Sequence, residues 1–158
     1  MADVALDVEI RSNAGKGAAR KLRQAISLAI DQEEFISIFQ NGRGVAAQGP
    51  IPPGLFGSRE GQPGFVNPVT HRLEGGKPVR RPIADAKKLL AEAGYPNGRE
   101  ADTGKPLVLY YDFQRAVTPE FKSENDWMAK QFAKLGIQLE IRATDFNQYQ
   151  DKTLKGKH

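Results

Sequence analysis

The sequence has no cysteine and only two histidines among its 158 residues. Without cysteine the chain cannot form disulfides, zinc ribbons or a thiol nucleophile. His71 and His158 have no partner at metal-ligand spacing, and we interpret His71 as a solvated side chain in a loop. The sequence also has no G-x-S-x-G motif and no complete phosphate-binding loop. We therefore predict no cofactor, no metal site and no catalytic residues.

Long apolar runs and dense clusters of charge are also missing. No apolar stretch approaches the ~20 residues needed to cross a bilayer. Residues 1–10 contain Asp3, Asp7 and Glu9, which are incompatible with the apolar part of a signal peptide. The 23 basic and 19 acidic residues give a net charge of +4, but the basic residues are spread along the chain. A nucleic-acid partner, which needs a denser basic stripe, is not predicted.

The pattern of apolar residues divides the chain into three parts of one expected domain. In residues 4–41, alternation over 4–10 predicts a strand, and helical spacing predicts helices over 18–30 and 31–41. Asp31 and Glu34 resemble a capping box at the start of the second helix. Residues 42–82 are rich in proline and glycine, and we predict a long ordered loop there.

The third part, residues 83–156, predicts alternating helices and strands. The expected elements are a helix over 83–93, a strand over 107–113, a helix over 118–135, a strand over 137–142 and a short helix from Asp145. The order strand, helix, strand predicts a right-handed βαβ unit with parallel strands. The fold class predicted from these patterns is α/β.

Few side chains in these elements are candidates for chemistry. Asp112 lies near the carboxyl end of a predicted strand, where ligands collect in α/β folds, although a turn or capping role is the alternative we favour. Tyr110 and Tyr111 are able to stack on a ligand. Trp127 has the same ability, but its helical spacing favours a place in the core.

Four segments together resemble one protein family. They are residues 22–31 (LRQAISLAID), the NGRG at 41–44 with the GPIPPG at 49–54, residues 85–96 (DAKKLLAEAGYP), and Trp127 followed by LGI at 135–137. In this order and spacing they are similar to the family 5 extracellular solute-binding proteins, the dipeptide and oligopeptide receptors of ABC importers. The resemblance covers residues from about Val4 to Gly156.

This resemblance implies a fold, a partner and a location. The chain would be a fragment of the second lobe of a periplasmic-binding-protein-like II fold, in a receptor that closes on its ligand like a hinged trap. It would bind a peptide or other small solute, deliver it to a membrane ABC permease, and lie in the periplasm or on the outer side of a membrane. The isolated fragment would expose apolar surface, which favours self-association.

Two short segments are predicted to face the ligand in such a receptor. The first is the stiff loop formed by Gly49, Pro50, Ile51, Pro52 and Pro53, because proline-rich backbone loses little entropy on binding. The second is the end of the strand at Tyr111 and Asp112. Two alternatives from other classes remain open, namely a small α/β enzyme that uses carboxylates such as Asp112 and an interaction module with a basic surface.

Overall fold

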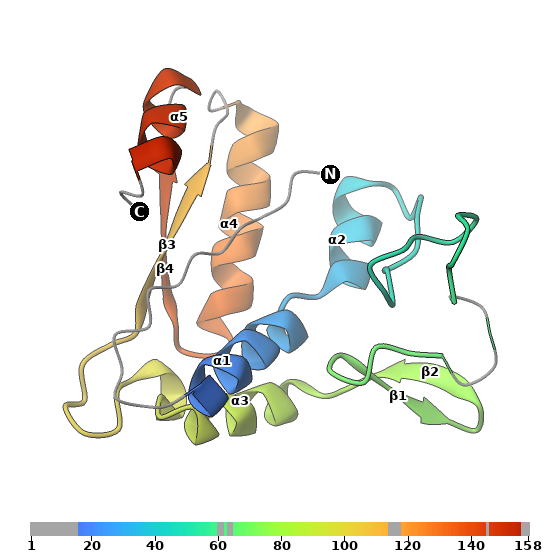
Figure 1. Ribbon diagram of the computed structural model, residues 1–158. Coiled ribbons are helices and arrows are strands. Elements are labelled where there is room, and N and C mark those ends of the chain that lie inside the picture. The colour runs from blue at the N-terminus through green and yellow to red at the C-terminus, as the bar shows by residue number, and fades with distance from the viewer. Residues whose placement is uncertain (1–15, 60–61, 63–64, 114–117, 145, 156–158) are drawn as a thin grey trace.

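The computed structural model describes residues 16–59, 62, 65–113, 118–144 and 146–155. Its elements, shown in Figure 1, are α1 (Lys16–Ala29), α2 (Gln32–Phe39), β1 (His71–Glu74), β2 (Lys77–Arg80), α3 (Ile83–Glu92), the short 3-10 helix η1 (Pro96–Gly98), β3 (Val108–Phe113), α4 (Pro119–Ala133), β4 (Gln138–Ala143) and α5 (Phe146–Lys155). Each helix predicted from the periodicity is present. The strand predicted over residues 4–10 lies outside the described residues.

The second half of the chain forms the predicted βαβ unit. β3 and β4 pair in parallel, from Val108 opposite Gln138 to Phe113 opposite Ala143, and α4 connects them. Thr118 caps α4, because its Oγ1 accepts a hydrogen bond of 3.3 Å from the Phe121 backbone N–H. Pro119 follows at the first helical position, where its missing N–H has no cost. The parallel pairing predicted from the order of elements is confirmed.

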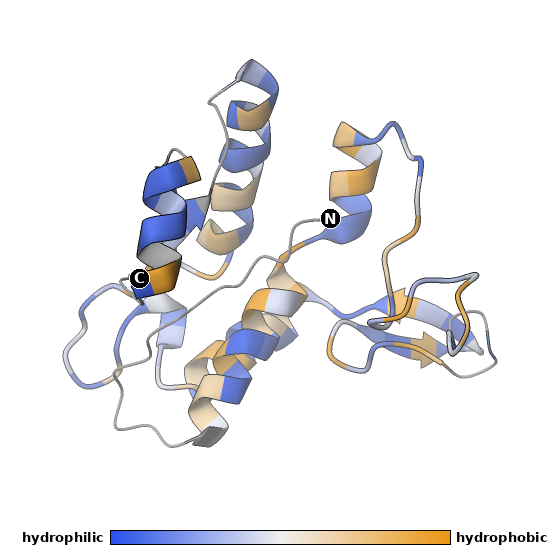
Figure 2. Cartoon of the chain, turned by 45° about the horizontal axis from the view of Figure 1, so that its top comes forward, coloured by the Kyte–Doolittle hydropathy of each residue, from blue (hydrophilic) through white to orange (hydrophobic). Residues whose placement is uncertain are grey.

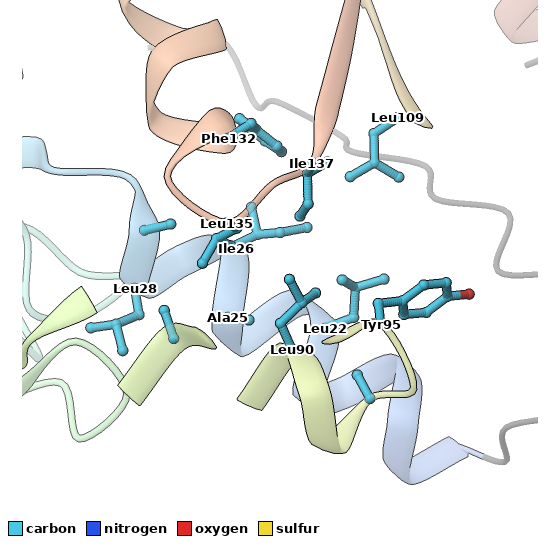
Figure 3. Packing of buried hydrophobic residues seen from close by; sticks show 13 residues of the cluster. Leu22, Ala25, Ile26, Leu28, Leu90, Tyr95, Leu109, Phe132, Leu135 and Ile137 are labelled. Atoms are coloured by element: carbon cyan, nitrogen blue, oxygen red, sulfur yellow. The ribbon is translucent and has the colours of Figure 1, made fainter. Parts of the chain in front are cut away.

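The apolar core lies where α1 crosses α3 and meets the base of the βαβ unit. Figure 3 shows Leu22 and Ile26 of α1 close to Leu90 of α3, with Leu135 and Ile137 above them. Leu90 is fully buried, and Leu22 is 1% exposed. The buried cluster consists of Leu22, Ala25, Ile26, Leu28, Ala29, Ala86, Leu90, Ala93, Tyr95, Leu109, Phe132, Leu135 and Ile137.

Two glycines allow a close crossing of backbones beside this core. Gly98 has a φ of +74° and Gly136 a φ of +75°, a backbone conformation that residues with a side chain rarely adopt. A Cβ on Gly98 would overlap the carbonyl oxygen of Gly136, and a Cβ on Gly136 would overlap that of Asn97. The turn after α3 and the turn after α4 therefore pack backbone against backbone, which fixes the start of β4.

We predicted that residues 42–82 form a long loop, but this range also contains a β-hairpin. β1 and β2 form an antiparallel hairpin with His71 opposite Arg80 and Glu74 opposite Lys77. Gly75 and Gly76, with φ values of +57° and +80°, make the connecting two-residue turn. This prediction was wrong because proline and glycine content was weighed above the Gly-Gly turn signal, which favours a hairpin.

Helix α2 begins and ends where the sequence predicts. The Asp31 side chain accepts a hydrogen bond of 3.0 Å from the Glu34 backbone N–H, which confirms the predicted cap. At the other end Gly42 donates to the Ile36 carbonyl at 3.0 Å, with Asn41 in the left-handed conformation at φ 51°. Figure 2 shows hydrophobic residues on α2 as well as on α1. Yet no residue of α2 is fully buried.

None of the described helices is long and apolar enough to cross a membrane.

Candidate functional site

A pocket of about 840 Å³ lies between α2, the loop that follows it and the β1–β2 hairpin. This volume falls within the range typical of small-molecule sites. Its walls combine apolar side chains with a few polar groups, and none of the described residues that line it is a lysine or an arginine. The lining residues are Glu33, Ile36, Ser37, Gly42, Gly44, Val45, Ala46, Gln48, Gln62, Phe65, His71, Leu73, Gly76 and Pro78.

An acid–histidine pair forms one wall of the pocket. Glu33 lies in the first turn of α2, and its Oε1 is 2.9 Å from Nε2 of His71, the first residue of β1. The other ring nitrogen, Nδ1, lies 2.9 Å from the Thr70 hydroxyl. The interpretation of His71 as a solvated loop residue was wrong, because this side chain is buried and bonded on both sides.

Arg80 holds this pair against the end of α1. Its Nη1 donates to Glu33 Oε2 at 3.0 Å, and its Nη2 donates to the Leu28 and Ile30 carbonyls at 2.7 and 2.8 Å. Its Nε lies 3.6 Å from Asp31 Oδ2. Carbonyls at the end of a helix have no partner within the helix, so a guanidinium is a favourable donor there. Arg80 thereby ties the base of the hairpin to both α1 and α2.

These contacts determine the protonation of Glu33. Partial burial alone would raise the pKa of the Glu33 carboxyl, because it disfavours the charged form. Its own backbone N–H, the hydrogen bond with His71 and the positive charge of Arg80 act in the opposite direction and prevail. The pKa of Glu33 is therefore lowered from its ordinary value of 4.5, and the pocket wall carries an ionised carboxylate at neutral pH.

The loop predicted to face a ligand begins at the rim of this pocket. Gln48 accepts a hydrogen bond of 3.1 Å from the Asn67 backbone N–H, and Phe65 packs close to Gly49. A Cβ on Gly49 would lie 3.3 Å from the Phe65 ring. The residues that follow, Pro50, Ile51, Pro52 and Pro53, are exposed and stand outside the set that lines the pocket.

The second predicted segment lies elsewhere in the molecule. Tyr111 and Asp112 are in β3, opposite Ile141 and Arg142 of β4, and both are half-buried. In Figure 1 β3 and the loop after α2 lie on opposite sides of the molecule. The structure therefore does not bring the two segments together. Asp112 is a strand residue, so the turn position that we favoured for it was wrong.

Trp127, the third candidate for ligand stacking, is a core residue instead. It is 7% exposed. The centroid of its ring lies 5.2 Å from the ring centroid of Phe35 and 6.2 Å from that of Phe39, and both phenylalanines belong to α2. Its indole Nε1 donates to Glu34 Oε2 at 3.0 Å. The place in the core predicted from helical spacing is confirmed.

Within the described ranges, no three histidine or acidic side chains come together in a way that would hold a metal ion. Of the described residues that line the pocket, Glu33 and His71 are of these types. What this arrangement supports is contact with a small, largely apolar group in an open pocket, with hydrogen bonding from the polar side chains of Ser37, Gln48 and Gln62.

The pocket was missed because its polar residues are far apart in the sequence. Glu33 and His71 are separated by 38 positions, and Glu33 and Arg80 by 47. Only the Gly75–Gly76 turn could have suggested that His71 and Arg80 face each other across a hairpin.

The comparisons with known proteins agree with the resemblance noted in the sequence. The family model for "Bacterial extracellular solute-binding proteins, family 5 Middle" matches residues 9–158. A heme-binding protein A from Haemophilus influenzae is 29% identical over 87% of this chain and 22% of its own length. A dipeptide-binding protein from Escherichia coli is 28% identical over 87% of this chain and 22% of its own length. The chain thus spans about a fifth of these relatives.

Solved structures share the fold at lower identity. A periplasmic binding protein DppA from Helicobacter pylori in complex with peptide STSA has a TM-score of 0.62 at 24% identity, covering 90% of this chain and 23% of that one. A lactococcal OppA complexed with an endogenous peptide in the closed conformation has a TM-score of 0.58 at 23% identity, covering 84% and 23%. The α/β arrangement is thus part of a periplasmic-binding-protein-like II lobe, as predicted. The chain belongs to the bacterial extracellular solute-binding proteins of family 5.

Proposed function

We propose that this chain is part of the ligand-binding lobe of a periplasmic receptor that delivers peptides or related solutes to an ABC importer. The observation that carries this proposal is the family match over residues 9–158. Two further facts support it, namely the parallel β3–β4 unit and the relatives that are themselves named for dipeptide or heme binding. In this proposal the protein has no enzymatic activity, and its partners are the solute and a membrane permease.

We further propose two ligand-contacting surfaces. One is the loop of Gly49 to Pro53 together with the pocket at its base, and the other is the strand end at Tyr111 and Asp112. A stiff proline loop reduces the entropy lost on binding. Because the two surfaces lie apart, a small solute contacts one of them, and an extended peptide contacts both.

Neither alternative function has an observation in its favour. The acidic side chain in the pocket, Glu33, is already bound by His71 and Arg80, which leaves it poorly placed to act as a proton carrier. Of the basic side chains, Arg80 and Arg81 are used in internal contacts with backbone carbonyls and with Glu33 and Asp85. These two groups are therefore not available to a basic binding surface.

An exchange experiment tests the proposal. The segment of the Escherichia coli dipeptide-binding protein that matches this chain is replaced by the chain itself, and binding of a dipeptide and oligopeptide panel is measured by titration calorimetry. We expect a folded chimera that binds solutes. Within it, Ala46→Trp fills the pocket and Tyr111→Ala removes the strand-end contact, and each is expected to weaken binding about tenfold, or about 1.4 kcal/mol.

The matched control is Asp126→Asn, an exposed position of α4 that we expect to leave affinity unchanged. A chimera that keeps the circular dichroism of the parent but binds no member of the panel contradicts the proposed function. A chimera whose affinity is the same in all three variants retains the function but removes both proposed surfaces.

A further inference from the structure

Helix α2 carries two neighbouring acidic residues that bind in different directions. Successive residues of an α-helix are rotated by about 100°, so the side chains of Glu33 and Glu34 leave α2 on different sides. Both residues are in the first turn. The Glu33 carboxylate binds His71 and Arg80 of the hairpin. The Glu34 carboxylate instead binds residues of α4.

The contacts of Glu34 converge on one oxygen. Trp127 Nε1 donates to Oε2 at 3.0 Å and Gln131 Nε2 at 2.8 Å, while Lys134 Nζ lies 3.6 Å away. Lys134 also donates to Gln131 Oε1 at 2.6 Å, which orients that amide. The two donors are buried, with Trp127 7% and Gln131 2% exposed, whereas the side chains of Glu34 and Lys134 are 43% and 40% exposed. The Glu34 carboxylate is therefore held at the edge of the solvent by two buried donors, and hydrogen bonds to a charged group are stronger than neutral ones.

Other forces that would hold α2 in place are weak. The helix has eight residues, too few to be stable on its own, and it buries none of them completely. Its further contacts among the described residues include those of Phe35 and Phe39 with the Trp127 ring and that of its cap residue Asp31 with Arg80. The position of α2 is therefore set largely by one aromatic cluster and by the carboxylates of Glu33 and Glu34, which face different partners.

We propose that α2 couples the β1–β2 hairpin to α4, with Glu34 as the positioning residue for the pocket. A shift of α2 on α4 moves Glu33, which lies one residue away in the same rigid turn. Because Glu33 is bonded to His71, a movement of Glu33 also moves His71, which forms part of the pocket wall. The environment of Trp127 and the geometry of His71 are thus linked through one helical turn. This inference concerns the chain itself and holds whichever solute, if any, the pocket takes.

The chain contains a convenient reporter at each end of this link. Trp127 is its single tryptophan, so its indole N–H gives one resonance in a nitrogen-15 spectrum. His71 is one of two histidines, and its ring signal is assigned by comparison with a His158→Gln variant. The test uses the full chain without any ligand, and its variants are Glu34→Gln, Glu33→Gln and the double substitution.

We expect each single substitution to shift both reporters, the nearer one more. The double substitution is expected to shift each reporter by less than the sum of the two single shifts, which is the signature of coupled sites. The control is Glu120→Gln, the same chemical change at an exposed position in the first turn of α4. It should leave the His71 signal in place.

A milder variant covers the case in which Glu34→Gln unfolds α2. Lys134→Met removes only the outermost partner of Glu34 and is expected to shift His71 in the same direction by a smaller amount. Trypsin cleavage after the exposed Arg43, which follows α2, gives a second measurement and should become about tenfold faster in Glu34→Gln. The inference is overturned if the substitutions at Glu34 and Lys134 shift only the Trp127 signal and leave the His71 signal and the cleavage rate unchanged.

Discussion

Two regions of this molecule are held together by different interactions. The region formed by α1, α3, α4 and the β3–β4 pair encloses a continuous apolar cluster. The region formed by α2, the loop after it and the hairpin has, among its described residues, only His71 buried. It is fixed by directed polar contacts from Glu33, Glu34 and Arg80. We therefore expect the first region to depend on the volume of its side chains, and the second to depend on its polar contacts more than on apolar burial.

The largest effect is expected at the backbone crossing beside the core. Gly98→Ala would place a Cβ against the Gly136 carbonyl oxygen, where neither backbone has room to move. We expect loss of the folded state, measured by circular dichroism in a urea series. Gly104→Ala is the matched control, since Gly104 also has a positive φ of +68° but no atom within 4 Å of the added Cβ. It should cost only about 1–2 kcal/mol.

A smaller effect is expected from shortening leucines in the two regions. Leu90 is fully buried between α1 and α3, and Leu90→Ala should lower the free energy of unfolding by about 3 kcal/mol through lost burial and a cavity. Leu73 in β1 is 42% exposed, and Leu73→Ala should cost less than about 1 kcal/mol. Equal losses in chemical denaturation would show that the hairpin depends on apolar burial as strongly as the core does.

The smallest effect is expected from the charge on Glu33. Because the pKa of Glu33 is lowered in the folded state, its contribution to stability is complete above the ordinary value of 4.5 and is lost as the pH falls through the lowered value. Glu33→Gln should remove this acid-dependent part of the stability curve. Melting temperatures measured between pH 3 and about pH 7 test this. If Glu33→Gln leaves the fall in melting temperature at acid pH unchanged, Arg80 and His71 stabilise the charged form of Glu33 no better than water does.

The two regions also differ in how far the sequence predicts them. The helical spacing of Leu22, Ala25 and Ile26 and the alternation from Ile137 to Ile141 report burial directly, so α1 and β4 could be placed to within a few residues. The order of strand and helix was enough to predict parallel pairing. The packing of Gly98 on Gly136 could not be seen, because each glycine alone resembles an ordinary helix end.

In the other region the decisive residues have no periodic signature. A cap at Asp31 is a local pattern and was predicted correctly, but the partner of the Glu34 side chain is Trp127, 93 positions away. The Glu33–His71 pair is similarly distant, and proline content obscured the hairpin that brings it together. Polar contacts across long separations depend on the finished fold, so single-sequence patterns predicted the scaffold far better than the pocket. The ligand contacts assigned to Gly49–Pro53 and to Tyr111 and Asp112 stay predictions.

The hydrogen bonds from Arg80 to the end of α1 bear on the order in which this chain folds. The guanidinium that satisfies the Leu28 and Ile30 carbonyls belongs to a residue 52 and 50 positions later. During synthesis α1 is able to form before the hairpin exists. The carbonyls at its carboxyl end receive the Arg80 hydrogen bonds only after the hairpin has been made and the intervening loop of about 50 residues has closed. The carboxyl end of α1 is thus satisfied only once the hairpin is in place, and the same arginine then also binds Glu33 at the pocket.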